Sequence, residues 1–273
     1  MQAKTLAFIG AGNMAKAIIG GLIAQGYDAK KITASGPRIE NLQKVTDDFS
    51  VNITTDNLAA VRNAEVIILS VKPQMLKQVA TELSSALAHK PLIISLAAGI
   101  TTESLERWLN GNLSIVRSMP NTPSQVLLGA TGLFANRFVS DEQKNIANEI
   151  LSAVGIVSWV EQEHLINSVT AVSGSGPAYY FLFMEAMIDA AIAQGLSRET
   201  ATALTLQTAL GAATLAAKSD LDVAELRRRV TSPKGTTEQA ILSFEKDQLR
   251  AIVKDAMQAC THRAEELSRL LGE

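Results

Sequence analysis

A glycine-rich segment near the N-terminus has the spacing of a phosphate-binding loop. It follows a strand-like run that ends at Ile9, opens a helix-like run, and consists of Gly10, Ala11, Gly12, Asn13, Met14 and Ala15. This G-x-G-x-x-A spacing is informative where a strand precedes it and a helix follows. Gly10 permits the tight turn, and Gly12 lets the backbone approach a pyrophosphate, which the N–H groups of the helix N-terminus can bind. The segment therefore predicts a dinucleotide-binding loop.

The end of the second predicted strand bears on the choice of dinucleotide. NAD-binding proteins usually carry Asp or Glu there, on the ribose 2′-hydroxyl. This chain reads Ser35-Gly36-Pro37-Arg38, and the first carboxylate, Glu40, falls in the next predicted helix. A 2′-phosphate would meet no negative charge there, and Ser35 and Arg38 can donate hydrogen bonds to it. We therefore expect NADPH and leave NADH open. The alternative is a solvent-facing turn that touches no ligand.

Three more segments follow predicted strands at their carboxyl ends, where ligands of open parallel sheets bind. They are Val71-Lys72-Pro73, Ala97-Ala98-Gly99 and Met119-Pro120-Asn121-Thr122-Pro123. The two prolines restrict the backbone around Asn121, which suits a polar side chain held rigidly beside a ligand. We expect the cofactor to be lined by Val71, Lys72, Pro73, Ala97, Ala98 and Asn121. The alternatives are a surface charge at Lys72 and a stiff connector at Asn121.

Two later loops are rich in glycine and hydroxyl groups and suit a small anion. They are Ser173-Gly174-Ser175-Gly176 and Ser232-Pro233-Lys234-Gly235-Thr236-Thr237, and each precedes a predicted helix. Backbone N–H groups in such loops can surround a carboxylate, and the helix N-terminus adds a favourable dipole. One such loop is more often a turn or a cap. Two of them beside a dinucleotide domain favour a substrate site.

The elements that position these loops differ between the two parts of the chain. Up to residue 162, short β-branched runs alternate with amphipathic helical runs, which predicts βαβ units and a parallel sheet. The strands are expected at 5–9, 31–35, 51–54, 65–70, 92–95, 114–118, 132–135 and 156–160. The helices between the first five are expected near 13–26, 37–48, 56–62 and 75–88. The fold class is therefore α/β, with a Rossmann domain over residues 1–162.

From residue 163 to residue 273 the strand rhythm stops and the sequence becomes alanine-rich with a helical period. This predicts an all-α second domain. Its apolar faces exceed what one small bundle can bury, so we expect a homo-oligomer.

Composition narrows the classes of partner. The chain has 273 residues and a net charge of −2, so no basic surface suggests nucleic acid or anionic lipid. Cys260 is the single cysteine and the three histidines are scattered, so we expect neither a disulfide nor a metal site. The most apolar helical run, 178–194, contains Glu185 and Asp189 and is short for a membrane span. With no signal-like start, we expect a cytoplasmic protein without membrane contact.

The motifs GAGNMA, SVKP, AAG, MPNTP, SGSGPAY and SPKGTT occur in this order along essentially the whole chain. Together they resemble the pyrroline-5-carboxylate reductase family, which reduces the ring C=N bond of 1-pyrroline-5-carboxylate to give L-proline. The resemblance implies an NAD(P)H-binding Rossmann domain followed by a helical dimerisation domain. It also implies dimers that often assemble into decamers, with a substrate loop that reaches the partner subunit.

The resemblance also implies residue roles. Ser35 and Asn57 would lie near the adenosine ribose phosphate, and Lys72 near the cofactor. Glu163 and the segment 232–237 would border the substrate, and Thr237 is the candidate to hydrogen-bond the ring nitrogen. The family's usual SPGGTT has lysine at position 234 here. A side chain at that position is tolerated if its φ is negative.

Three alternative functions remain open on the sequence. One is another cyclic-imine reductase. A β-hydroxyacid dehydrogenase would need a lysine on the helix after its glycine-rich segment, and residues 173–187 contain none. A non-catalytic dinucleotide sensor, which belongs to a different class, would need no second ligand loop.

Overall fold

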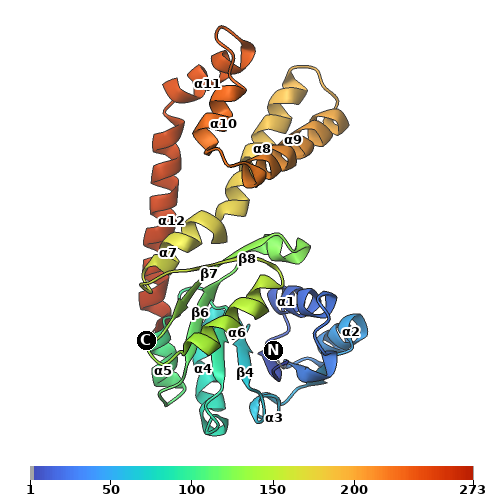
Figure 1. Cartoon of the computed structure of the whole chain (residues 1–273), viewed down its shortest axis with the longest axis vertical. Helices are drawn as coiled ribbons and strands as arrows, with labels where there is room; N and C mark the ends of the chain where they lie inside the picture. The colour runs from blue at the N-terminus through green and yellow to red at the C-terminus, as the bar shows by residue number, and fades with distance from the viewer. Residues whose placement is uncertain (1–2, 273) are drawn as a thin grey trace. The chain divides into compact units, whose positions relative to one another are not determined.

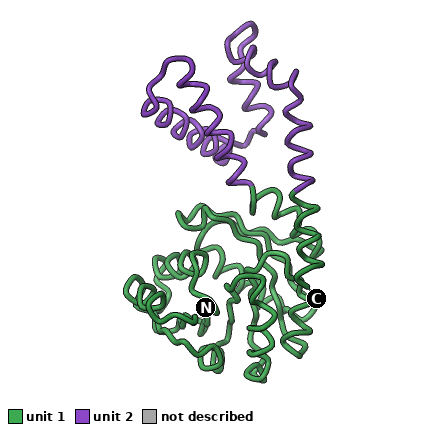
Figure 2. Tube along the Cα trace, turned by 180° about the vertical axis from the view of Figure 1, so that it is seen from behind, with its two compact units in different colours: residues 1–175, 260–273 green, residues 176–259 purple. Residues whose placement is uncertain are grey.

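The computed structural model describes residues 3–272, which form two compact units. Unit 1 contains the described residues up to Ser175 together with those from Cys260 onward, and unit 2 contains Gly176–Ala259 (Figure 2). The two units are described separately below.

Unit 1 is built on one eight-stranded sheet across the described residues, in the order β3-β2-β1-β4-β5-β6-β7-β8 (Figure 1). All neighbouring strands are parallel except β6 and β7. The order 3-2-1-4-5-6 is that of a doubly wound dinucleotide-binding sheet. The strands are β1 (Leu6–Ile9), β2 (Ile32–Ser35), β3 (Asn52–Thr54), β4 (Val66–Leu69), β5 (Leu92–Ser95), β6 (Ile115–Met119), β7 (Gly129–Ala135) and β8 (Gly155–Trp159). All eight predicted strands are present, and β7 begins three residues earlier than expected.

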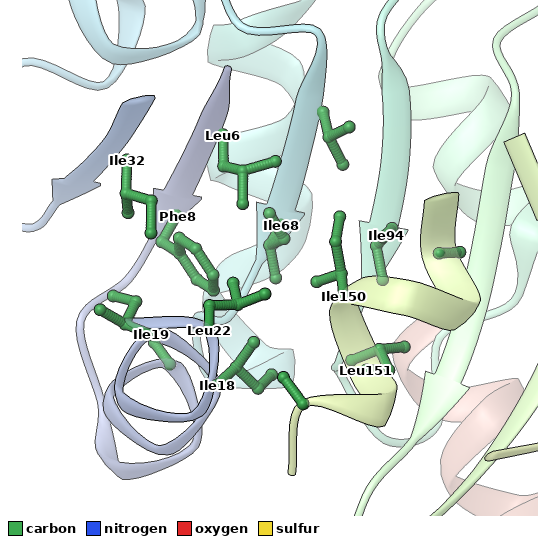
Figure 3. Packing of buried hydrophobic residues seen from close by; sticks show 14 of the residues in the cluster. Leu6, Phe8, Ile18, Ile19, Leu22, Ile32, Ile68, Ile94, Ile150 and Leu151 are labelled. Atoms are coloured by element: carbon green, nitrogen blue, oxygen red, sulfur yellow. The ribbon is translucent and has the colours of Figure 1, made fainter. Parts of the chain in front are cut away.

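Helices cover the sheet because its central strands are apolar on both faces. In β1, Leu6 and Phe8 belong to one core cluster, whereas Ala7 and Ile9 belong to the other. The first cluster includes Ile18 of α1 and Ile150 of α6 (Figure 3). The helices of this unit are α1 (Asn13–Ala24), α2 (Ile39–Phe49), α3 (Asn57–Val61), α4 (Pro73–Leu83), α5 (Thr102–Trp108), α6 (Asp141–Ser152) and α7 (Leu165–Val169). Short 3-10 turns occupy Ala29–Lys31 (η1), Ser84–Ala86 (η2) and Thr122–Val126 (η3), and a π-helical turn, Thr170–Gly174 (η4), continues α7.

Unit 2 is helical. It contains α8 (Gly176–Ala193), α9 (Arg198–Lys218), α10 (Val223–Arg229), α11 (Thr236–Lys246) and the first part of α12 (Leu249–Gly272). Many of its large apolar side chains are exposed in the single chain, among them Tyr180, Leu182 and Leu210. None of the described helices combines the length and the apolar character that a membrane span requires.

The division by compactness differs from the boundary at 162/163 expected from the sequence. The chain passes from the first unit to the second at Ser175, after α7 and η4, which both contact β7. The last part of α12 returns to unit 1, where Leu267 approaches the backbone of Gly99. The boundary at 162/163 marks where strands give way to helices, and as a division between functional domains it stays a prediction.

Candidate cofactor and substrate site

The glycine loop after β1 has the geometry that a bound dinucleotide requires. Gly10 has φ +96°, its N–H donates to the Ser35 carbonyl at 2.9 Å, and a Cβ there would lie 2.7 Å from the Ser70 carbonyl oxygen. Gly10 therefore admits no side chain. A Cβ on Gly12 would meet nothing within 4 Å, and no side chain caps α1 at this residue. The space beside Gly12 is thus open and no side chain caps the first turn of α1, which fits a pyrophosphate bound there.

At the end of β2, which was expected to select the cofactor, Ser35 forms a hydrogen-bonded pair with Asn57. Ser35 is fully buried, and its hydroxyl donates to the Asn57 Oδ1 atom at 2.5 Å. Asn57 begins α3 and is half-buried. Because its oxygen accepts the serine proton, the NH₂ group of Asn57 is the part of this pair that can donate to a ligand. Arg38 is exposed at the start of α2.

The loops after β4 and β5 lie at the same edge of the sheet, since these strands are parallel neighbours. Lys72 is exposed and precedes α4, whose first residue is Pro73. After β5, Ala97 is buried, whereas Ala98 is exposed. The structure therefore brings these predicted cofactor residues to the carboxyl edge that also carries the glycine loop.

Asn121 is held by the protein at both ends of its side chain. Its Oδ1 accepts from the Ala130 N–H at 2.9 Å, and its Nδ2 donates to the Ser173 carbonyl at 3.0 Å. The side chain is 8% exposed. Asn121 thus ties the loop after β6 to β7 and to the turn at 173–176. A contact between this amide and the cofactor stays a prediction.

The first glycine-serine loop, residues 173–176, runs from the end of the π-helical turn η4 to the first residue of α8. The Ser175 N–H donates to the Thr170 carbonyl at 2.8 Å, and a Cβ on Gly174 would lie 2.5 Å from the Met119 Cε atom. The close approach of Met119 explains the glycine at position 174. In addition, the Cys260 thiol donates to the Ser175 hydroxyl at 3.3 Å, so α12 contacts this loop within unit 1.

Glu163 accepts from two residues that the motifs did not reveal. Its carboxylate accepts from the Thr102 N–H at 2.7 Å, from the Thr102 hydroxyl at 2.8 Å and from Arg117 Nη1 at 3.1 Å. Arg117 is 3% exposed. Burial lowers the pKa of its guanidinium, and the Glu163 carboxylate opposes that shift. The local signal was a charged residue, Arg117, inside a strand with three apolar residues.

The second loop, 232–237, lies wholly in unit 2 and leads into α11. Gly235 precedes α11 without a side-chain cap, and its N–H donates to the Ser232 carbonyl at 3.0 Å. Thr236 and Thr237 are exposed in the first turn. This arrangement leaves hydroxyl and N–H groups that can donate hydrogen bonds to a carboxylate. That the loop binds substrate stays a prediction.

Lys234 contradicts one expectation. We expected a negative φ at this position, but its φ is +63°, in the left-handed region that favours glycine. The Lys234 N–H donates to the Oε2 atom of Glu238, in the first turn of α11, at 2.7 Å. The backbone conformation at position 234 is therefore one that favours the glycine usual in the family, although the residue here is lysine.

Two family models match the chain. Residues 5–99 match the model described as NADP oxidoreductase, coenzyme F420-dependent. Residues 163–267 match the model described as pyrroline-5-carboxylate reductase dimerisation.

Full-length relatives and solved structures agree with these matches. The chain is 52% identical to a pyrroline-5-carboxylate reductase of Pseudomonas aeruginosa, over 100% of both chains. It is similar to the structure of a pyrroline-5-carboxylate reductase from Coxiella burnetii, with a TM-score of 0.95, 48% identity and coverage of 98% and 99% of the two chains. The Plasmodium falciparum pyrroline carboxylate reductase with NADP bound gives a TM-score of 0.86 and 30% identity, again over 98% and 99%. This chain belongs to the pyrroline-5-carboxylate reductase family.

Proposed function

We propose that this chain reduces 1-pyrroline-5-carboxylate to L-proline with NADPH. The observation that carries the proposal is the 52% identity to a pyrroline-5-carboxylate reductase over the full length of both chains. The open glycine loop at Gly12 supports it from the structure. The two glycine-hydroxyl loops add donors for a small carboxylate.

For the cofactor, we propose that the loop after β1 binds the pyrophosphate and that the strand tip binds the adenosine ribose phosphate. The Asn57 NH₂ group and Arg38 are the donors there, and Ser35 orients Asn57. Binding of NADP by the Plasmodium falciparum relative supports this choice. The proposed lining is Ile9, Gly10, Ala11, Gly12, Asn13, Met14, Ser35, Arg38, Asn57, Val71, Lys72, Pro73, Ala97, Ala98 and Asn121.

For the substrate, we propose binding by Ser173, Gly174, Ser175, Gly176, Ser232, Gly235, Thr236 and Thr237, with Glu163 at the border of the site. When bound, the reduced nicotinamide supplies the hydride to the imine carbon. The chain's own task is to hold the ring and its carboxylate in place, which can supply much of the barrier reduction. The Thr237 hydroxyl hydrogen-bonds the ring nitrogen, which gains a proton as the C=N bond becomes an amine.

Glu163 does not serve as the general acid in this proposal. Its two oxygens already accept hydrogen bonds from Thr102 and Arg117, so both are engaged within the protein. The proton on the ring nitrogen therefore comes from the protonated substrate or from solvent.

We further propose that the helical unit forms the dimer. Its exposed apolar side chains and the match to a dimerisation model support self-association. Assembly of dimers into a decamer, a substrate loop that reaches the partner subunit, and a cytoplasmic location stay predictions.

The test is NADPH oxidation on addition of 1-pyrroline-5-carboxylate, with proline identified as the product and NADH measured in parallel. Turnover with NADPH and formation of proline are expected. Turnover of other cyclic imines alone would assign a different imine reductase. Binding of NADPH without turnover of any cyclic imine would favour the sensor, and oxidation of a β-hydroxyacid would favour that class of dehydrogenase.

A further inference from the structure

The environment of Glu163 is unusual for an ion pair that serves stability alone. Arg117 is 3% exposed, Thr102 is 5% exposed, and the Glu163 side chain is 21% exposed. Removing two charges from water costs several kcal/mol per ion, and a well-packed apolar pair often stabilises a fold as well or better. The pair therefore calls for a role other than stability of the fold.

The contacts of Glu163 join two segments that both carry proposed site residues. Thr102 is the first residue of α5, and the loop just before it contains Ala97 and Ala98. Glu163 stands two residues before α7, which continues through η4 into the turn at 173–176. One carboxylate thus fastens the loop on the proposed cofactor side to the helix that leads to the proposed substrate side.

Arg117 determines how that carboxylate is held. It lies in β6 in register with Ser95, the last residue of β5, so its side chain starts beside the strand that feeds the Ala97 loop. Its Nη1 atom bonds Oε1, the same oxygen that accepts the Thr102 N–H. Oε2 is then directed to the Thr102 hydroxyl. The guanidinium therefore orients the carboxylate toward the N-terminus of α5.

Two other charged groups of α5 are engaged elsewhere. On α5, Glu106 accepts from Asn136 and pairs with Arg137, and Arg107 donates to the Gly272 carbonyl. Among the described residues, Arg117 is the one charged group that bonds Glu163.

We propose that Arg117 and Thr102 are positioning residues of the reductase site, acting through Glu163. They hold the loop between β5 and α5 at a set distance from the segment that leads to the 173–176 turn. The inference rests on the proposed function. It predicts a loss in the rate of the reaction step with little loss of NADPH binding, because the phosphates are held by loops after β1 and β2.

The experiment compares R117M, R117K and T102V with E106Q. Glu106 is a suitable control because it is on the same helix and its side chain is 17% exposed, close to the 21% of Glu163. It bonds Asn136, just after β7, and pairs with Arg137, so its own polar contacts are with other residues than those of the Glu163 cluster. For each variant, kcat, the KM for 1-pyrroline-5-carboxylate, the Kd for NADPH and the unfolding midpoint are measured. Hydrogen exchange of segments 97–105 and 165–175 is followed in the cofactor-free protein.

R117M is expected to lower kcat by about 10-fold to 100-fold, the scale of a misplacement of about 1 Å. Its Kd for NADPH should change by less than about 3-fold, and both segments should exchange faster. T102V, a milder change that keeps the shape, should lower kcat severalfold, and R117K should recover part of the loss. E106Q should leave kcat unchanged.

The proposal is overturned if R117M and T102V lower kcat no more than E106Q does at an equal loss of stability. It is also overturned if NADPH affinity falls in parallel with kcat, or if exchange in the two segments is unaffected. A wild-type chain that does not turn over 1-pyrroline-5-carboxylate would contradict the proposed function instead. In that case, the exchange and NADPH-binding measurements would still report on whether Arg117 and Thr102 hold Glu163 in place.

Discussion

The Ser35 hydroxyl donates to the side-chain oxygen of Asn57 across 2.5 Å and joins the end of β2 to the start of α3. The serine is fully buried, so it contributes by fixing the orientation of the asparagine amide. No carboxylate lies at the end of β2, where NAD-binding proteins usually have an acceptor, and the Asn57 NH₂ group beside Ser35 is a donor. The pair therefore suits a ligand with a phosphate on its ribose.

Ser35→Asp tests this pair. A carboxylate at the strand tip should repel a 2′-phosphate and lower kcat/KM for NADPH at least about tenfold, or about 1.4 kcal/mol, with a smaller effect on NADH. Ser35→Ala removes the hydroxyl without adding charge and serves as the control. Equal losses with NADPH and NADH in Ser35→Asp would show that the strand tip does not face the 2′ position.

The glycine loop allows a paired test of fold and binding. Gly12→Ala adds a methyl group into open space at φ −77°, so the unfolding midpoint should hold while NADPH affinity falls. Gly10→Ala places a Cβ 2.7 Å from the Ser70 carbonyl oxygen at φ +96°, so stability should fall by more than about 1–2 kcal/mol. Thermal unfolding and NADPH titration of both variants are the measurements. Unchanged affinity in Gly12→Ala would remove this loop from the cofactor site.

Lys234→Gly should stabilise the protein. A left-handed conformation costs a residue with a side chain about 1–2 kcal/mol, and glycine avoids this cost. Glycine also makes the unfolded chain more flexible, which offsets part of the gain in folding stability. We expect a net gain of about 0.5–1 kcal/mol in denaturant unfolding at constant protein concentration. Lys90→Gly is the matched control, because Lys90 has φ +54° in unit 1. A loss of stability in Lys234→Gly alone would mean that the lysine side chain has a stabilising contact in the assembled protein.

Thr237→Ala should lower kcat/KM by roughly 1–2 kcal/mol, the effect of one lost hydrogen bond to a polar substrate. The residue is exposed at the first turn of α11. Thr237→Ser retains the hydroxyl and should keep most of the activity. Steady-state kinetics with unchanged values in Thr237→Ala would remove this residue from the substrate site.

The local parts of the fold could be predicted from the sequence because their signals are local. Runs such as Val66–Leu69 are apolar throughout, as expected for a strand buried on both faces. The glycine loop at Gly10 has its whole spacing within six residues. Both features appear in the structure where they were expected.

The long-range contacts had no such signal. Glu163 bonds Thr102, 61 residues away in the sequence, and Arg117, 46 residues away. The residue types around these positions do not indicate that they are in contact. The contacts of the Asn121 side chain with Ala130 and Ser173 were not predicted, and its contact with a ligand stays a prediction. The sign of φ at Lys234 depends on the loop geometry and the bond to Glu238, which the residue type alone does not indicate.

The helix α12 has a consequence for synthesis of the protein. Its Gly272 carbonyl accepts from the Ser104 hydroxyl at 2.9 Å, so residues late in the chain complete the surface of unit 1 around α5. On the ribosome, the strands of the sheet emerge first, yet this surface stays uncovered until residues 260–272 have been made. Unit 2 is contiguous, from Gly176 to Ala259, and is synthesised in full before unit 1 is finished. Unit 1 is therefore begun before unit 2 but completed after it.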